Sequence, residues 1–505
     1  MRNLNRTAIA AMVVCAGAAA GFAQNVGPST TTVPYILPTA PGVSTTSILT
    51  VGDTIGGYRM VGIPDGLGAF TADGQQNAFT LLMNHELGAT VGAVRAHGTT
   101  GAFVSRWEIG NNLQVTSGRD HNQSGADQRF WDGSQYVAGP GAYGRLCSAD
   151  LAPASAYRFG NLGTDARLFM NGEEVGAEGR AFAHIVTGPN TNQSYQLPYL
   201  GRFSWENSMA SPFAQQKTIV AGTDDSTPGQ VYFYVGDKTA SGSDIERAGL
   251  SNGLLYGVAV SATAAEQRSG GASGSFSLVS VGAGPNQTGA ALQTASTAAG
   301  VTEFLRPEDG AWDTRAGHEN DFYFVTTDRF DSNINAGTPA GQDGRSRLYR
   351  MRFADITNPT AGGEITPLLS GTEGQQMLDN MCIDSHGRIV MQEDPGNQDH
   401  LARTWLYDID SGGYGEVARF RADLFGPGAP GLLTRDEESS GIIDAGGLLG
   451  DGWFLLDAQA HYGIPGELVE GGQLLAMYID PSIIPSPGAV ALLGLGGLVV
   501  LRRRR

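Results

Sequence analysis

The sequence has only three cysteines, Cys15, Cys147 and Cys382. We expect Cys15 to leave with a signal peptide, so one disulfide at most could form and a disulfide-stapled scaffold is excluded. The chain also lacks a Gly-x-Ser-x-Gly nucleophile elbow, a P-loop, a Cys-x-x-Cys pair and a His-Glu-x-x-His motif. If the protein is an enzyme, metal-assisted chemistry is therefore the simplest class.

Basic residues are scarce: 32 Lys and Arg stand against 50 Asp and Glu, and the net charge is -18. Six of the basic residues lie at the two ends of the chain, where acidic residues are absent (Arg2, Arg6 and Arg502 to Arg505). So acidic a central region argues against nucleic acid as a partner. It favours multivalent cations, because carboxylate oxygens are the ligands that hard cations prefer.

Helical periodicity is also scarce. The 73 glycines and 23 prolines punctuate short apolar or alternating runs such as "AFTLLMN", "QVYFYVG", "DFYFVTTD" and "RIVMQED". Such runs predict strands, and a chain of 505 residues exceeds one simple core. We expect an all-β fold, a β-propeller rather than an α/β protein. Residues Thr30 to Thr50 and Gly282 to Gly300 are predicted to be loops or excursions.

A repeat becomes visible when acidic residues are followed along the chain. An acid starts each unit, and a second acid ends the next strand 15 to 20 residues later (Glu206 and Asp224, Glu308 and Asp328, Asp379 and Asp394, Glu438 and Asp457). In a propeller the first strand of each blade lines the axis, so the first acids should converge there. Converging carboxylates repel one another at low dielectric unless a cation neutralises them.

Three stretches carry candidate site residues. "NHE" places His85 beside Glu86, and neighbours on a regular strand cannot both face one metal. "NGEEVGAEG" offers Glu173 and Glu174 on a glycine-rich turn, either as cation ligands or as a solvated acidic turn. "FLRPEDGAWD" sets Arg306 two residues before Glu308; this is either a pocket in which the arginine holds an anionic oxygen or a structural ion pair.

The two ends predict export. Residues 1–23 have a basic start, an apolar stretch and a small-residue cleavage site, as in a signal peptide. Residues 485–505 combine prolines, a short Gly-Leu-rich run and four terminal arginines, and they resemble the PEP-CTERM class of sorting tags. We expect a domain at 24–484, a secreted or cell-envelope location, and a membrane machinery that processes the tail.

Several motifs occur in an order that resembles the PhoX family of secreted alkaline phosphatases, in its branch labelled as a domain of unknown function (DUF839). They are "NHE", "CSADL", "NGEEVGAEGRAFAH", "SWEN", "RPEDGAWD" with "YFVTTD", and "DNMCID" with "GRI". The resemblance implies a propeller of six blades. It also implies an iron–calcium centre that hydrolyses small phosphate esters.

Carried over by residue, the resemblance implies one thiolate ligand, Cys147, and a set of glutamate ligands (Glu173, Glu174, Glu206, Glu308 and Glu438). We expect catalytic roles for Glu308 and for Arg306, whose guanidinium group could hold an anionic substrate oxygen. A Cys147–Cys382 disulfide is the main rival to the thiolate. Two other functions stay open: a calcium-dependent lactonase or esterase, and a calcium-binding envelope or matrix protein without catalysis.

Overall fold

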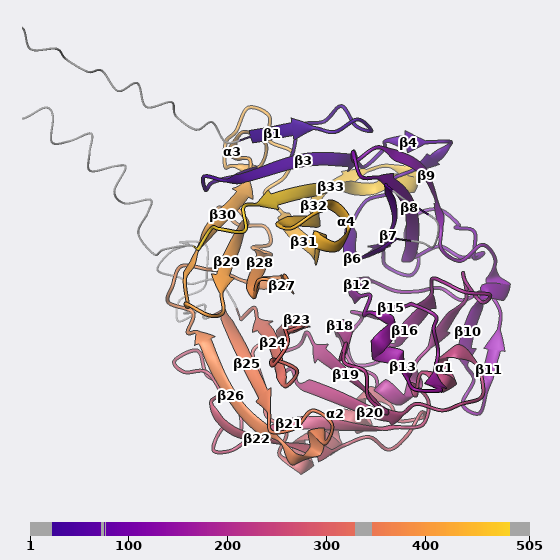
Figure 1. Ribbon diagram of the computed structural model, residues 1–505. Coiled ribbons are helices and arrows are strands. Elements are labelled where there is room, and N and C mark those ends of the chain that lie inside the picture. The colour runs from indigo at the N-terminus through magenta and orange to yellow at the C-terminus, as the bar shows by residue number, and fades with distance from the viewer. Residues whose placement is uncertain (1–22, 72–74, 76, 329–345, 485–505) are drawn as a thin grey trace, which may run out of the picture.

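A computed structural model describes residues 23–71, 75, 77–328 and 346–484. The expected signal peptide, apart from Ala23, and the expected tail lie outside the described residues. The described chain is nearly all strand, and its sheets stand radially around a common axis (Figure 1). The all-β propeller predicted from the strand-like runs is confirmed.

Each four- to six-stranded sheet has one strand at the axis and further strands outside it, and the nine-stranded sheet has two strands at the axis. The first sheet has the order β6 (Pro64–Phe70), β7 (Ala78–His85), β8 (Phe103–Gly110) and β9 (Val115–Asp120). The second runs outward from β12 (Leu146–Asp150) through β15 (Leu168–Glu173), β16 (Ala181–Ile185), β17 (Ser194–Gln196) and β10 (Gln128–Trp131) to β11 (Tyr136–Ala138).

Two groups of strands join into one sheet at their outer edges. The first group is β18 (Trp205–Ala210), β19 (Lys217–Asp224), β20 (Val231–Asp237), β21 (Leu254–Val260) and β22 (Gly274–Ser280). The second is β23 (Pro307–Trp312), β24 (Asp321–Thr326), β25 (Arg347–Phe353) and β26 (Gly363–Leu369). Because β22 pairs with β26, this sheet has nine strands, and the blade count of six stays a prediction.

The N-terminal strands close the last two sheets. One contains β27 (Leu378–Ile383), β28 (Arg388–Glu393), β29 (Arg403–Asp408), β30 (Tyr414–Phe420) and β2 (Ile36–Pro38). The other contains β31 (Glu437–Asp444), β32 (Trp453–Ile464), β33 (Val469–Ile479), β3 (Val43–Thr50) and β1 (Ala23–Val26). The N-terminal strands β2 and β3 pair with the C-terminal strands β30 and β33, and this pairing covers sheet edges that would otherwise be open. It also closes the circular arrangement of sheets.

The remaining elements are short. Two-stranded pairs are formed by β4 (Thr54–Ile55) with β5 (Tyr58–Arg59) and by β13 (Arg158–Phe159) with β14 (Leu162–Gly163). The described α-helices are α1 (Asp244–Arg247), α2 (Gly289–Ala299), α3 (Ala422–Phe425) and α4 (Gly446–Leu449). The 3₁₀ turns are η1 (Gly125–Asp127), η2 (Ala154–Tyr157), η3 (Pro198–Leu200), η4 (Pro359–Ala361) and η5 (Gly466–Leu468). Within the described ranges, no helix is long and apolar enough to cross a membrane.

Two predicted loops are wrong in part. Residues 30–50 contain β2 and β3; β3 is buried over nearly its whole length and pairs in antiparallel register with β33. Residues 282–300 contain α2, where Thr288 caps the helix and Gly300 ends it in a left-handed conformation. Small and β-branched polar residues suit both a loop and a covered edge strand, so composition alone did not separate the two.

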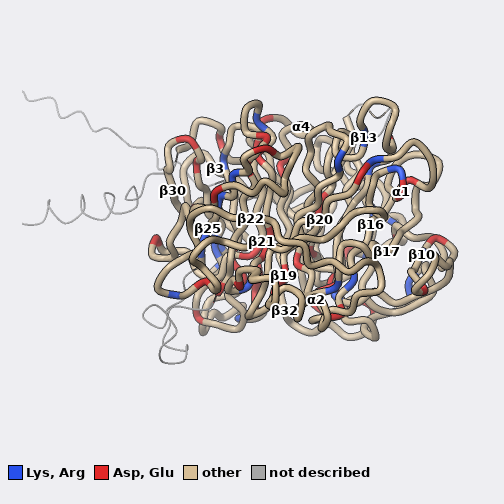
Figure 2. Tube along the Cα trace, turned by 90° about the horizontal axis from the view of Figure 1, so that it is seen from below, with Lys and Arg blue, Asp and Glu red and all other residues tan. Residues whose placement is uncertain are grey.

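The central strands β6, β12, β18, β23, β27 and β31 neighbour one another in a closed ring. They approach closely, since a Cβ on Gly66 would lie 2.5 Å from the backbone nitrogen of Ala149. The sheets bury their side chains on both faces, which explains the continuous apolar runs in the sequence. Acidic and basic positions are interspersed over the outside when the chain is seen from below (Figure 2). The ring sets the geometry of the site.

Candidate metal centre

Each of the six central strands carries an acid or a thiol at its second position (Asp65, Cys147, Glu206, Glu308, Asp379 and Glu438). In five of the strands the antiparallel register shifts at this residue, and in β31 it shifts slightly later, at Ser440. A bulge of this kind redirects a side chain out of the regular ladder. The strands thus present six ligand-type groups at one end of the ring.

The backbone just before three of these strands is strained. Ile63, Arg306 and Met377 directly precede β6, β23 and β27, and their φ angles are 49°, 59° and 49°. Positive φ is costly for such side chains, above all for β-branched Ile63. Packing that holds this conformation keeps the acid two positions later in its place.

Ligand-type atoms gather into two buried groups. One oxygen each of Asp65 and Glu86 and the thiol of Cys147 lie within 4.8 Å of one another. One oxygen each of Glu206, Glu308 and Asp379 forms a second group with the same spacing. The groups are joined because Cys147 Sγ lies 3.4 Å from Asp65 Oδ2 and 3.1 Å from Glu206 Oε2.

Glu174 extends the first group through Arg145, which it shares with Glu86. Both carboxylates form ion pairs with Arg145, and Gln459 donates hydrogen bonds to Asp65 at 3.2 Å and to Glu86 at 3.0 Å. His85 instead contacts the Ser105 hydroxyl at 2.9 Å on the other side of its strand. The alternation expected for "NHE" is therefore observed, and only Glu86 reaches the centre.

Arg306 lies beside Glu308, as its place in the sequence suggested. Its Nε and one terminal nitrogen donate to Asp225 at 2.7 and 2.9 Å, and the same terminal nitrogen lies 3.3 Å from Glu308 Oε1. Thr327 also donates a hydrogen bond to Glu308. The bidentate contact with Asp225 fixes the guanidinium group in one orientation.

Glu438 closes the ring on its far side together with a histidine. His461 Nε2 lies 3.6 Å from Glu438, and His461 Nδ1 lies 2.6 Å from Glu470. Burial alone lowers the pKa of His461, but the two glutamates outweigh it and raise that pKa to about 11. At neutral pH this histidine is a cation next to the carboxylate group.

The electrostatics of the cluster are unfavourable for the protein alone. Burial first, and neighbouring carboxylates second, raise the pKa of Asp65, Glu206 and Asp379 well above the ordinary range. The same two causes, opposed by Arg145, raise the pKa of Glu174 to about 9. Burial and the nearby carboxylates also raise the pKa of the Cys147 thiol. A bound cation would reverse these shifts.

Several buried oxygens here have no hydrogen-bond partner among the described residues (Glu206 Oε1, Glu308 Oε2, and both carboxylate oxygens of Asp457). Buried carboxylate oxygens are costly when they are left unpaired. Hard oxygen donors together with one thiolate suit a mixed centre, with oxygen for calcium and sulfur for a softer metal such as iron. The residues present therefore fit the metals that the resemblance implied.

The structure brings five of the six expected ligands together and leaves Glu173 apart. Both oxygens of Glu173 contact Arg180, at 2.5 and 2.6 Å, and Oε1 also accepts from the Gly144 amide at 2.8 Å. Glu173 faces one side of β15 and Glu174 follows it in the chain, so adjacent acids point apart. The sequence could not decide which of the pair faces the axis.

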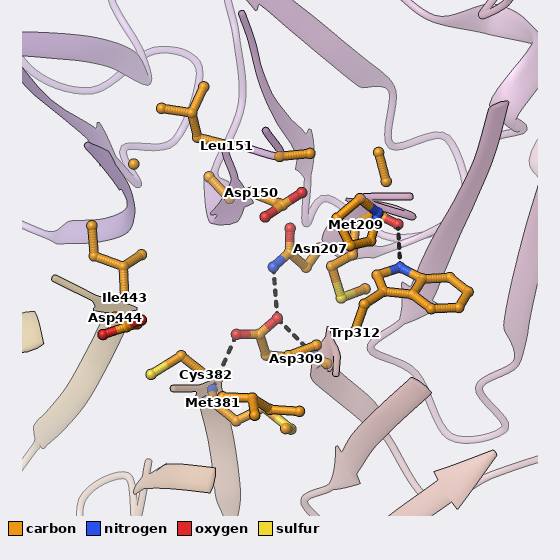
Figure 3. Close-up of a pocket in the computed structure, with 18 of the residues that line it drawn as sticks. Asp150, Leu151, Asn207, Met209, Asp309, Trp312, Met381, Cys382, Ile443 and Asp444 are labelled. Carbon is orange, nitrogen blue, oxygen red and sulfur yellow. Dashed lines mark hydrogen bonds between the residues drawn. The ribbon is translucent and has the colours of Figure 1, made fainter. Parts of the chain in front are cut away.

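Both described cysteines are free thiols, so the Cys147–Cys382 disulfide is not formed. Cys382 lies further along its central strand and lines a cavity of about 270 Å³ at the other end of the channel (Figure 3). Asp309 also lines this cavity, where it accepts hydrogen bonds from Asn207 at 2.6 Å and from the Met381 amide at 3.0 Å. The two sulfurs belong to opposite ends of the ring.

Sequence reasoning missed Asp65, Glu86 as a member, and Asp225. Asp65 had a usable signal, because Pro64 and Asp65 begin a strand in the way that Pro307 and Glu308 do. Asp225 had no such signal, since Asp224, the residue before it, fitted the repeat equally well. The acids that end the repeats also diverge. Asp457 lies in the cluster, whereas Asp328 pairs with Arg268 at 2.9 Å.

Comparisons with known proteins show the family of the chain and a similar fold. A family model described as alkaline phosphatase PhoX matches residues 152–436, which is more than half of the chain. A search of curated proteins found no match to this chain. Pseudomonas fluorescens PhoX in complex with vanadate, a transition state analogue, has a similar fold. Its TM-score is 0.63 at 13% identity, over 92% of this chain and 99% of that one.

Two other solved structures are more distant. The BP39L lectin from Burkholderia pseudomallei has a TM-score of 0.33 at 13% identity, over 84% of this chain and 99% of that one. CoXyl43, a β-xylosidase/α-arabinofuranosidase from a compost microbial metagenome, has a TM-score of 0.32 at 9% identity, over 87% and 94%. Neither carries an argument about this site. On the family match, the chain belongs to the alkaline phosphatase PhoX family.

Proposed function

We propose that this protein is a metal-dependent phosphatase that cleaves phosphate esters at the carboxylate and thiol ring. The family match supports hydrolysis of phosphate esters, and it spans Glu174, Glu206 and Glu308. The similar fold of a PhoX protein that binds vanadate, a transition state analogue, is consistent with this chemistry. The observation that carries the proposal is the ring itself, in which six central strands each place an acid or a thiol at the second position.

The proposed metals are calcium and iron. The residues that would hold them are Glu86, Glu174 and the six ring members (Asp65, Cys147, Glu206, Glu308, Asp379 and Glu438). Bound cations would neutralise the converging charge and polarise the phosphoryl oxygens of an ester. Glu173 is left out of this set because its carboxylate is engaged by Arg180.

The rim of the cluster favours an anionic substrate. Arg145, Arg306 and His461 keep 49%, 29% and 27% of their side-chain surface exposed, while the carboxylates between them are largely buried. A phosphate ester approaching the cluster meets these cations first. We assign to Arg306 the binding of a phosphoryl oxygen, since Asp225 holds its planar group in a fixed position.

Export forms the other part of the proposal. The basic and apolar start of the sequence and its proline-preceded, arginine-ended tail support a secreted or cell-envelope protein with a sorting tag. Fractionation of cells that express the full chain tests this. The mature protein should be found outside the cytoplasm, and deletion of residues 2–22 should retain it inside.

Hydrolysis of a chromogenic phosphomonoester by the purified full-length protein, with and without added calcium, tests the function. Activity that requires calcium and disappears in Glu308→Gln would support a phosphatase. Calcium-dependent hydrolysis of a carboxylic ester or lactone, but not of the phosphomonoester, would favour the esterase. A calcium-dependent rise in thermal stability with no hydrolysis of either substrate would favour the binding protein.

A further inference from the structure

A second polar cavity lies away from the metal centre, between the first and second sheets. Its volume is about 520 Å³, and three arginines line it. Arg106 lies on β8 and Arg119 on β9 of the first sheet, and Arg167 directly precedes β15 of the second. Three guanidinium groups in one cavity are unusual for a chain whose net charge is -18.

Two of these three arginines contact backbone carbonyl oxygens instead of carboxylates. Arg106 pairs with Glu108 at 3.3 Å. Arg119 donates to the carbonyl oxygens of Asp120 and His121, at 3.1 and 3.4 Å. Arg167 donates to two carbonyl oxygens as well, those of Ala152 at 3.0 Å and Leu151 at 2.9 Å.

Within the described part of the chain, no carboxylate forms an ion pair with Arg119 or Arg167. Asp165 also lines the cavity, but it pairs with Arg158 at 2.8 Å and is 82% exposed. Burial and the like charge of Arg106 lower the pKa of Arg119, and they outweigh the opposite effect of Glu108 and Asp120. The cavity thus keeps an excess of positive charge.

The other lining groups can complete an anion site. The hydroxyl oxygen of Thr191 is buried and has no hydrogen-bond partner among the described residues. Thr187 accepts a hydrogen bond from the Arg167 amide at 2.8 Å, which leaves its own hydroxyl hydrogen free to donate. The ring of Phe70 lies 5.6 Å from the guanidinium carbon of Arg106 and 6.0 Å from that of Arg167, so it packs against both groups.

We propose that this cavity is a second anion-binding site, which takes a phosphate or sulfate group carried by a molecule larger than the free ion. Arginine donors match the oxygens of such groups in a bidentate manner. Two unpaired arginines supply the charge, and the threonine hydroxyls supply neutral donors. The cavity exceeds the size of a bare ion, which leaves room for the remainder of the ligand. The site is independent of the metal centre and of the proposed activity.

Titration calorimetry of the full-length protein with sodium sulfate, at constant ionic strength set by sodium chloride, tests the site. Sulfate should bind with one ion per chain, and inorganic phosphate should compete with it. Arg119→Gln should weaken binding by about tenfold or more, because it removes a charge-assisted hydrogen bond. Arg59→Gln is the matched control, since Arg59 is 44% exposed, lies outside the cavity and carries the same charge.

Arg167 also holds two backbone carbonyls, so its variant must keep that role. Arg167→Lys keeps the charge but loses the planar group, and it should weaken sulfate binding while the circular dichroism spectrum stays unchanged. Equal sulfate binding in the wild type, Arg119→Gln and Arg59→Gln would overturn the proposal, as would no binding by the wild type at millimolar sulfate. If Arg119→Gln fails to fold, Arg119→Lys replaces it, with the same expected loss.

Discussion

The thiol of Cys147 lies 3.1 Å from Glu206 Oε2 and thereby joins the two groups of buried ligand-type atoms. Burial and the surrounding carboxylates raise its pKa, so the thiolate is disfavoured in the protein alone and needs a cation to form. This contact links the strand ring to the proposed metal chemistry, and the predictions below test different parts of that link.

The first prediction concerns the cysteines. Because Cys147 and Cys382 are both free and lie at opposite ends of the channel, the unfolded, metal-stripped protein without its signal peptide should titrate as two free thiols. Titration with a thiol reagent in denaturant measures this. Absence of free thiols would restore the disulfide and remove Cys147 as a ligand.

The second prediction compares two glutamates that lie in different environments, Glu206 in the ring and Glu173 beside Arg180. Glu206→Gln should lower the metal content, because Glu206 has an unpaired buried oxygen inside the ring. Glu173→Gln should leave the metal content unchanged and destabilise the fold by about 1–3 kcal/mol, since it leaves Arg180 without its partner. Metal analysis and denaturant unfolding of both variants provide the comparison. Equal metal loss in the two variants would contradict this assignment.

The third prediction assigns substrate binding to Arg306. Arg306→Ala should raise KM by about tenfold or more and keep the bound metal, because the lost contact is a charge-assisted hydrogen bond to the phosphoryl group. Arg306→Lys should recover part of the affinity. Arg315→Lys is a control, since Arg315 makes a similar bidentate contact with Asp313 away from the ring. An unchanged KM in Arg306→Ala would remove this role.

The fourth prediction concerns the pH dependence of stability and Asp150, which lines the same cavity as Asp309 and Cys382. Burial and the nearby charge of Asp309 raise the pKa of Asp150 from 3.8 to about 7. An acid with a raised folded pKa contributes stability that is present below its unfolded pKa and is lost as pH rises through the folded value. Asp150→Asn should therefore be more stable than the wild type at pH ~8, by about 1–3 kcal/mol for this partly exposed group.

Denaturant unfolding at pH ~5 and pH ~8 measures this difference. The advantage of Asp150→Asn over the wild type should be small at the lower pH and should grow towards the higher one. The same advantage at both pH values would show that the carboxylate is not titrating in that interval.

Much of the fold could be predicted because the signals were local. Short apolar runs bounded by glycine and aspartate predicted strands, and the first acids of the repeat, such as Glu206 and Glu308, do converge on the axis. The closure by β2 and β3 could not be predicted. It depends on pairing between residues from opposite ends of the chain, as in Ile36 with Phe420 and Val43 with Ile479, which leaves no local pattern.

The site was predictable only in part, for a similar reason. Bulges and positive φ angles decide which of two adjacent acids faces the axis, and these follow from packing rather than from composition. The pair Glu173 and Glu174 shows the difficulty, since one pairs with Arg180 and the other reaches the cluster. Asp65 enters the cluster from a segment that the repeat did not single out, and Asp225 directly follows Asp224, which the repeat selected instead.

The most direct test of the central claim is the iron and calcium content of the protein, purified without added metal or chelator, in the wild type and in Cys147→Ser. The account predicts that both metals are bound to the wild type and that iron is lost in the variant, because a hydroxyl is a poor substitute for a thiolate ligand. A wild-type protein that holds neither metal, or a variant that keeps its iron in full, would contradict the metal centre proposed for this ring.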